Sequence, residues 1–188
     1  MDIQKIIINM TKSFEDIYEE VEKLQQDTER FFFIDMCMFR VEDGKKHSQV
    51  DCFFNSFQYS KNRKCFKAYF DYEKKFLNIF EQIWLYNKTL VYGDNNKKYI
   101  KKAISNSELR YYNSNFKSGD ECCSKDLLDI LVKISSRDVG TFLFYFEEFN
   151  CLIIPLWSCM AIYFGDTSKI SVIEKIINVN GLYLRRME

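Results

Sequence analysis

Proline and glycine are scarce in this chain, which has one proline and six glycines among its 188 residues. This scarcity excludes a collagen-like chain and the composition of a proline- and glycine-rich disordered linker. It also leaves no glycine-rich loop for binding phosphate, because neither G-x-G-x-x-G nor G-x-x-x-x-G-K-[ST] occurs. The hydrolase motif G-x-S-x-G and the metalloprotease motif H-E-x-x-H are missing as well. We therefore predict no catalytic residues.

Histidine is scarcer still, and the single His47 stands beside two lysines and an Asp-Gly pair in "EDGKKHSQ". An ordinary zinc site takes three or four ligands from cysteine, histidine and carboxylates at recognisable spacings. Cys122 and Cys123 are adjacent, and the chain has no second cysteine pair. We predict no metal site and no cofactor. A Cys–His nucleophile pair would need His47, which we interpret as a solvated turn residue.

Neither sign of charge is in excess, since 27 basic and 27 acidic residues give a net charge of zero. Nucleic-acid-binding proteins usually carry a basic surplus. The stretches "KNRKCFKAYF" and "NNKKYIKKAI" interleave basic and aromatic residues, as a groove for single-stranded nucleic acid does. Because the whole chain is not basic, we interpret both as solvated faces and predict no direct nucleic-acid partner.

The seven cysteines are odd in number, irregular in spacing and mostly set in apolar runs. A secreted disulfide framework would have an even number set among turns. The start "MDIQKIIINMTKSFED" has no basic region before its short apolar patch, and no small-residue cleavage site, so it predicts no signal peptide. We expect reduced, buried cysteines and a cytoplasmic protein.

The longest uncharged run, residues 149–165, reaches the lower length limit of a membrane span. Its flanks are Glu147, Glu148 and Asp166, with no lysine or arginine nearby to set an orientation. Pro155 divides the run into two strand-length pieces, "CLIIP" and "WSCMAIYF". The sequence therefore predicts two buried strands and no membrane span.

Aromatic residues are abundant, with 18 Phe, 12 Tyr and 2 Trp, which favours a sheet-rich core. Helical spacing of apolar residues predicts helices at 13–29, 69–86, 124–137 and 172–178, with Ser13 and Ser124 as N-caps and a Ser171–Glu174 capping box. Strands are predicted in hairpins at 30–41 with 48–59 and within 89–104, at 141–146, in the divided run, and at "LYLRRM". Residues 105–120 are predicted to be an exposed connection.

These elements predict an α+β fold: one globular domain spanning residues 1–188, with a mainly antiparallel sheet and about four helices packed on it. Two acidic groups are candidate contact residues, one on the wet face of helix 13–29 and one at the tip of the hairpin after 141–146. The apolar run adds a tryptophan. The predicted partner-binding residues are Asp16, Glu19, Glu20, Glu22, Glu147, Glu148 and Trp157.

In general character the chain resembles the immunity proteins that bacteria carry against the toxic C-terminal domains of contact-dependent growth-inhibition systems. The shared features are a single domain under 200 residues, abundant aromatics and the absence of a catalytic motif; no residue motif carries the resemblance. It implies a cytosolic inhibitor that occludes a toxin, with a nuclease among the candidate partners, through complementary charge and aromatic anchors. Two alternatives stay open: an enzyme without a recognised motif, using a cysteine or a carboxylate, and a viral host-interaction protein.

Overall fold

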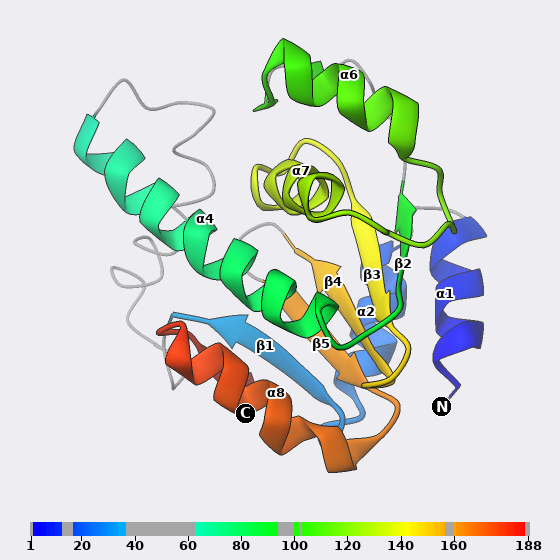
Figure 1. The fold of residues 1–188 in the computed structure, drawn as a ribbon. Helices are drawn as coiled ribbons and strands as arrows, with labels where there is room; N and C mark the ends of the chain where they lie inside the picture. Colours follow the sequence, from blue (N-terminus) through cyan, green and yellow to red (C-terminus); the bar gives the residue numbers. More distant parts are fainter. Residues whose placement is uncertain are drawn as a thin grey trace.

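A six-stranded sheet with strand order β2-β3-β4-β5-β1-β6 forms the centre of the protein, and every neighbouring pair in it is antiparallel (Figure 1). The structure, a computed structural model, describes residues 2–12, 17–36, 63–93, 100–101, 103–156 and 160–186. The strands are β1 (Phe31–Asp35), β2 (Thr89–Gly93), β3 (Phe142–Phe146), β4 (Cys151–Pro155), β5 (Met160–Phe164) and β6 (Tyr183–Arg186).

Helices cover both faces of this sheet (Figure 1). One face packs against α1 (Ile3–Lys12) and α2 (Ile17–Gln25). The other packs against α4 (Arg63–Trp84), α7 (Lys125–Ser136) and α8 (Ile170–Val179), which a 3-10 turn, η2 (Thr167–Lys169), precedes. The sixth helix, α6 (Asn106–Asn115), packs on α7. The α+β class and antiparallel sheet are confirmed, although the described residues form six helices and not about four.

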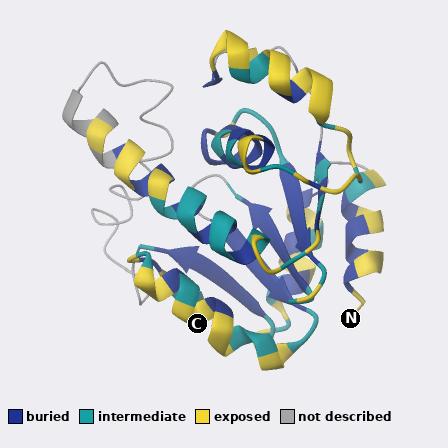
Figure 2. Cartoon of the chain, viewed as in Figure 1, coloured by how far each residue is buried: buried dark blue, intermediate teal, exposed yellow. Residues whose placement is uncertain are grey.

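Strands β1, β3, β4 and β5 are buried along their whole length (Figure 2). Successive side chains on a strand point to opposite faces, so each strand supplies two separate cores. In β1, Phe31 and Phe33 face α1 and α2, whereas Phe32 and Ile34 face the α4 layer. The aromatic richness of the chain thus fills both layers.

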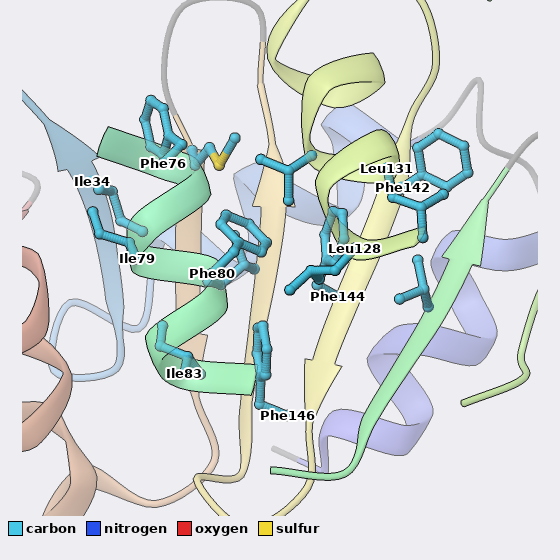
Figure 3. Close-up of a cluster of buried hydrophobic side chains, with 14 of the residues drawn as sticks. Ile34, Phe76, Ile79, Phe80, Ile83, Leu128, Leu131, Phe142, Phe144 and Phe146 are labelled. Carbon is cyan, nitrogen blue, oxygen red and sulfur yellow. The ribbon is translucent and has the colours of Figure 1, made fainter. Parts of the chain in front are cut away.

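Helix α4 places its apolar stripe directly on this sheet, as Figure 3 shows for Phe76, Ile79, Phe80 and Ile83. These residues recur every three or four positions and therefore share one helix face. The Phe80 ring packs edge-on against Phe144, with centroids 4.7 Å apart. The helix predicted at 69–86 is confirmed, and it begins six residues earlier.

The uncharged run forms two strands, as predicted. β4 and β5 pair antiparallel, and Pro155 ends β4 opposite Met160, where a missing backbone N–H is tolerated. None of the helices in the described ranges has the length and apolarity needed to cross a membrane. Trp157 and Cys159 lie outside the described residues.

Two hairpins were predicted before residue 105, at 30–41 with 48–59 and within 89–104. The strand in 89–104 is confirmed as β2, but it pairs with β3, and residues 100, 101 and 103 are helical, so that hairpin is wrong. The predicted partner of β1, residues 48–59, lies outside the described residues. Both edges of Phe31–Asp35 are occupied, by β5 and β6.

The segment predicted as an exposed connection, 105–120, is mostly exposed, but it contains α6, so the prediction of a connection without a helix is wrong. A capping box begins this helix: the Ser105 hydroxyl accepts from the Glu108 backbone N–H at 3.3 Å, and the Glu108 carboxylate accepts from the Ser105 N–H at 2.8 Å. Glu108 also accepts from Lys133 of α7 at 2.8 Å. The Ser-x-x-Glu pattern of this capping box is present in the sequence. The helix was nevertheless missed, because few of its apolar residues recur at helical spacing.

The remaining helix predictions hold with changes at their ends. Residues 13–29 contain α2, which α1 precedes as a separate helix; Ser13 lies outside the described residues. Helix 124–137 is confirmed with Ser124 as its N-cap. The Ser171–Glu174 capping box is wrong, because α8 begins at Ile170 and Asp166 instead caps the preceding 3-10 turn. The edge strand at the end of the sheet is confirmed as β6.

One buried ion pair joins α4 to the end of α7. Arg137 donates from Nε and Nη2 to the two carboxylate oxygens of Glu73, each at 2.7 Å. The Tyr69 hydroxyl donates to the same carboxylate at 2.8 Å, and Arg137 Nη1 donates to the carbonyl of Ala103. Because the carboxylate and guanidinium are both almost wholly buried, each depends on the other for compensation.

Replacing Phe80 by alanine tests the packing of α4 on the sheet. Phe80 is fully buried between the helix and β3, so Phe80→Ala should lower the free energy of unfolding by about 3–5 kcal/mol. Urea denaturation measures this change. The control Val179→Ala, at a side chain 77% exposed, should change it by less than about 0.5 kcal/mol. Equal effects of the two substitutions would contradict the packing.

Replacing only one partner of the buried Glu73–Arg137 ion pair should lower the free energy of unfolding more than replacing both partners. Arg137→Met leaves the Glu73 carboxylate buried without its cation and should destabilise the fold by about 3–5 kcal/mol. The double variant Glu73→Leu/Arg137→Met should recover much of that loss. Lys117→Met, which removes an exposed pair with Asp120, is the control and should cost less than about 1 kcal/mol. The described pairing is refuted if the double variant is as unstable as two additive single losses.

Candidate functional site

Cys122 and Cys151 carry buried thiols that are not suited to nucleophilic chemistry. Burial raises the pKa of Cys122 to about 12 and also raises the pKa of Cys151, which lies fully inside the sheet layer. A thiol with such a pKa is neutral near pH 7, whereas the thiolate is the nucleophile. Cys123 is exposed, and His47 lies outside the described residues. The part of the chain that the structure describes brings together no three His, Cys, Asp or Glu side chains suited to a metal ion.

The predicted acidic contact residues fall into two separate groups. Glu19 and Glu22 are exposed on α2, and Glu20 beside them forms an ion pair with Lys23. Glu147 and Glu148 form the β3–β4 turn at one end of the sheet, as expected of a hairpin tip. Asp16 and Trp157 lie outside the described residues, so their part in either group stays a prediction.

A groove of about 290 Å³ between α6 and α7 is a further candidate, lined by Glu108, Asp126, Asp129 and Lys133 among others. Two of its three carboxylates have cationic partners within the chain. Glu108 pairs with Lys133 at 2.8 Å, and Asp129 pairs with Lys125 at 3.3 Å. Two of the three carboxylates are thus compensated, so this groove has weak attraction for an external cation.

The β3–β4 turn is hydrogen-bonded to the loop that follows α4 (Figure 1). The Glu147 N–H donates to the carbonyl of Lys88 at 3.0 Å, and the Lys88 N–H donates to the Glu148 carboxylate at 2.6 Å. The Phe149 N–H donates to the Asn87 side-chain oxygen at 2.8 Å. These three bonds join residues 87–88 to residues 147–149. We refer to the segments that contain them, 85–88 and 147–150, as the 85–88/147–150 frame.

Local hydrogen bonds and backbone conformation hold both segments of this frame in place. Asn87 donates its side-chain amide to the carbonyl of Ile83 at 2.7 Å, which satisfies one of the free carbonyls at the end of α4. Asn150 has a φ of 44°, and asparagine tolerates this left-handed conformation better than most residues. Gly165 approaches so closely that an added Cβ would lie 2.5 Å from the Asn150 amide nitrogen. The turn is therefore held from both sides.

Two large apolar side chains are exposed on the frame: Leu85 is 62% exposed and Tyr86 is 70% exposed. Both follow Ile83, the last fully buried residue of the α4 stripe, and neither continues that stripe. Exposed apolar residues grouped on an ordered surface are a common feature of protein-binding sites.

Lys88, two residues after Tyr86 in the chain, forms an exposed ion pair. Lys88 Nζ contacts the Glu147 carboxylate at 3.2 Å. The hydrogen bond and charge of Glu147, followed by the charges of Glu121 and Glu148, raise the pKa of Lys88. The charges of three glutamates therefore act on this one ammonium group. We name this set the Lys88 surface; it consists of Leu85, Tyr86, Lys88, Glu121, Glu147 and Glu148.

Glu121 reaches this surface because the chain before α7 follows the outer edge of β2. The Cys122 N–H donates to the carbonyl of Thr89 and the Gly119 N–H to that of Val91, both at 2.8 Å. An isolated bridge sets Glu121 opposite Leu90. This segment also satisfies backbone groups on an edge strand that would otherwise stay open to another chain.

The sequence predicted only two of the six residues of the Lys88 surface. Glu147 and Glu148 were predicted, whereas Leu85, Tyr86, Lys88 and Glu121 were missed. One signal was available, since Leu85 and Tyr86 are apolar and yet lie off the helical stripe that ends at Ile83. No signal joined Glu121 to Lys88, because their proximity depends on the tertiary pairing of two distant segments.

Comparison with known proteins finds no match: no family model matches the chain, and no curated protein or solved structure is significantly similar to it.

Removing the Asn87 side chain should loosen the frame without affecting the core. Asn87→Ala deletes the acceptor for the Phe149 N–H, and a lost hydrogen bond is worth about 0.5–1.5 kcal/mol. The Phe149 amide should therefore exchange its hydrogen about tenfold faster, as measured by NMR. Asn115→Ala is the matched control, because Asn115 also donates to the carbonyl four residues earlier but accepts from no other element in the described contacts. An unchanged Phe149 exchange rate in Asn87→Ala would contradict the frame.

Proposed function

We propose that this chain is a cytosolic binding protein that inhibits a protein partner by occluding its functional surface, and that the Lys88 surface makes the contact. One observation carries the proposal: Leu85 and Tyr86 are exposed on a hydrogen-bonded frame that also includes Glu147 and Glu148. The arrangement fits a partner with a basic, partly apolar face.

The physics of protein interfaces supports this assignment. Binding energy concentrates in a few anchors, among which tyrosine is enriched, and surrounding polar groups exclude water from them. Excess charge of one sign accelerates association with a partner of opposite sign and fixes its orientation. A surface ordered before binding loses less conformational entropy on association. Tyr86, the carboxylates and the frame correspond to these three requirements.

Within this proposal the partner is a toxin with a basic surface, as the resemblance to immunity proteins implies. Cys122, Cys123 and Cys151 are free thiols, as the proposal of a reducing compartment requires. The acidic residues of α2, Glu19 and Glu22, form a secondary surface that lies on the opposite helix layer from α4. We expect them to contribute less, because α2 presents one large exposed apolar side chain, Tyr18 at 39%, against two on the frame.

Affinity chromatography with the full chain, including the product of the neighbouring gene, tests this function. The wild type should retain one basic protein in stoichiometric amount and suppress its activity. Tyr86→Ala should weaken that complex by about 2 kcal/mol, or roughly 30-fold, as a hot-spot truncation does. Glu148→Gln should also weaken it, and both are measured by calorimetry.

Matched controls separate a specific contact from a general loss of charge or apolar area. Glu19→Gln removes the same charge from α2, and Val179→Ala removes apolar area from an exposed site on α8. Both should leave affinity within about twofold of wild type. If they weaken the complex as much as Tyr86→Ala and Glu148→Gln do, the Lys88 surface is not the contact site. Recovery of no protein partner, together with turnover of a substrate, would refute the binding function itself.

A further inference from the structure

We propose that two copies of this chain associate through the outer edge of β6, so that the sheet continues from one copy into the other across a two-fold axis at Leu184. This inference does not depend on the proposed function. β2 and β6 are the opposite edges of the sheet, and Lys88 directly precedes β2. Pairing through β6 therefore leaves the Lys88 surface of each copy accessible.

The backbone of β6 has hydrogen-bonding groups that point away from the sheet. The Phe164 N–H donates to the Arg30 carbonyl, so even-numbered residues at β1 bond to β5 and its odd-numbered residues bond to β6. Within β6 the partners of these odd-numbered residues are Tyr183 and Arg185. The N–H and carbonyl of Leu184 thus point outward, and no hydrogen bond in the described part of the chain reaches them.

The two edges of the sheet differ in their protection. The segment before α7 covers the edge of β2 with backbone hydrogen bonds. Charged side chains often protect an edge strand, and β6 contains two arginines. However, Arg185 Nη2 lies 3.0 Å from the Asp35 carboxylate of β1. The guanidinium of Arg186 lies over the Phe32 ring, also in β1, at 5.4 Å. Both groups are thus engaged with β1, and neither blocks the outer side of β6.

A two-fold axis at Leu184 gives the register that the side chains favour. It pairs Leu184 with its own copy through two backbone hydrogen bonds, and it sets Tyr183 opposite Arg185 of the second copy. An axis at Arg185 would set the two copies of this arginine opposite each other, which is unfavourable for like charges. An axis at Tyr183 would pair the end of β6 with the turn at Gly181, which has a φ of 72°.

The favoured register brings an exposed ring onto an ordered side chain. Tyr183 is 39% exposed. Arg185 lies on the same face of the strand, and its guanidinium is held by Asp35 and stacks over the Phe33 ring at 5.0 Å. Its aliphatic stem is therefore fixed, and Tyr183 of the second copy can cover it. On the other face, Leu184 is partly buried against the α4 layer and meets its own copy.

The remaining charge does not oppose this pairing, although the contact is small. Arg186 lies two residues from the axis in each copy, so the two side chains stand roughly 13 Å apart along the strands. This separation exceeds the Debye length of about 8 Å at physiological salt. Two strands of four residues bury little area, which is typical of a weak and reversible complex.

Sedimentation velocity of the full chain over a range of concentrations tests the dimer. The wild type should show a monomer–dimer equilibrium with a dissociation constant on the order of tens of micromolar. Exchange of the Leu184 amide hydrogen, followed by NMR, should slow as the concentration rises. Leu184→Pro removes the outward N–H, which the single chain does not use, and should abolish the dimer; proline is tolerated at such an edge position.

Substitutions at Tyr183 test the register at an exposed position. Tyr183→Lys pairs with Asp35 inside its own chain, so the fold is kept, but it sets a cation opposite Arg185 of the second copy. Because this contact occurs twice, the dimer should weaken by about tenfold. Tyr183→Phe keeps the ring and should leave the dissociation constant within about twofold of wild type. Tyr86→Ala, on the Lys88 surface, should leave it equally unchanged.

Three results would overturn the inference. The first is a wild-type chain that stays monomeric up to about 1 mM. The second is a dimer that Tyr183→Lys does not weaken, and this variant decides the question if Leu184→Pro fails to fold. The third is a dimer that Tyr86→Ala weakens while Tyr183→Lys does not, which would place the contact at the Lys88 surface. None of these results bears on whether a basic protein partner binds the Lys88 surface.

Discussion

Burial of the sheet on both faces is the constraint on which the rest of the structure depends. Four of its six strands are buried along their whole length between two layers of helices. Large side chains must fill two cores, and the chain supplies 32 aromatic residues for them. Because helices cover both faces of the four buried strands, those strands offer no surface for a partner. The outer helix faces, the loops at the sheet ends and the edge strand β6 remain accessible.

The 85–88/147–150 frame lies at such an end and receives its order from the core. Ile83 fixes the last turn of α4 on the sheet, and Phe146 fixes the end of β3. The loop and the turn that continue from these residues meet and exchange hydrogen bonds. Their exposed side chains, Leu85 and Tyr86, are thus carried on backbone that is already in place. Packing in the interior and recognition at the surface are connected through residues that are neighbours in the chain.

Much of this fold could be predicted from the sequence, and the failures have physical causes. Strong apolar periodicity marked α4 and α7, and Pro155 between acidic flanks correctly divided β4 from β5. Helix α6 was missed because only Tyr112 within it is buried, so its stripe is weak. A third of the site could be predicted: hairpin chemistry placed Glu147 and Glu148 at a tip, whereas the approach of Glu121 to Lys88 depends on segments 33 residues apart. No pattern of neighbouring residues in a single sequence predicts that pairing.

The central claim is that the Lys88 surface is ordered before any partner arrives. Backbone order parameters of the free chain, from ¹⁵N relaxation, measure this most directly at residues 85–88 and 147–150. The account predicts values near about 0.85, the level of rigid secondary structure, because hydrogen bonds join both segments. Values below about 0.6 at these amides would show a flexible pair of loops and contradict the account.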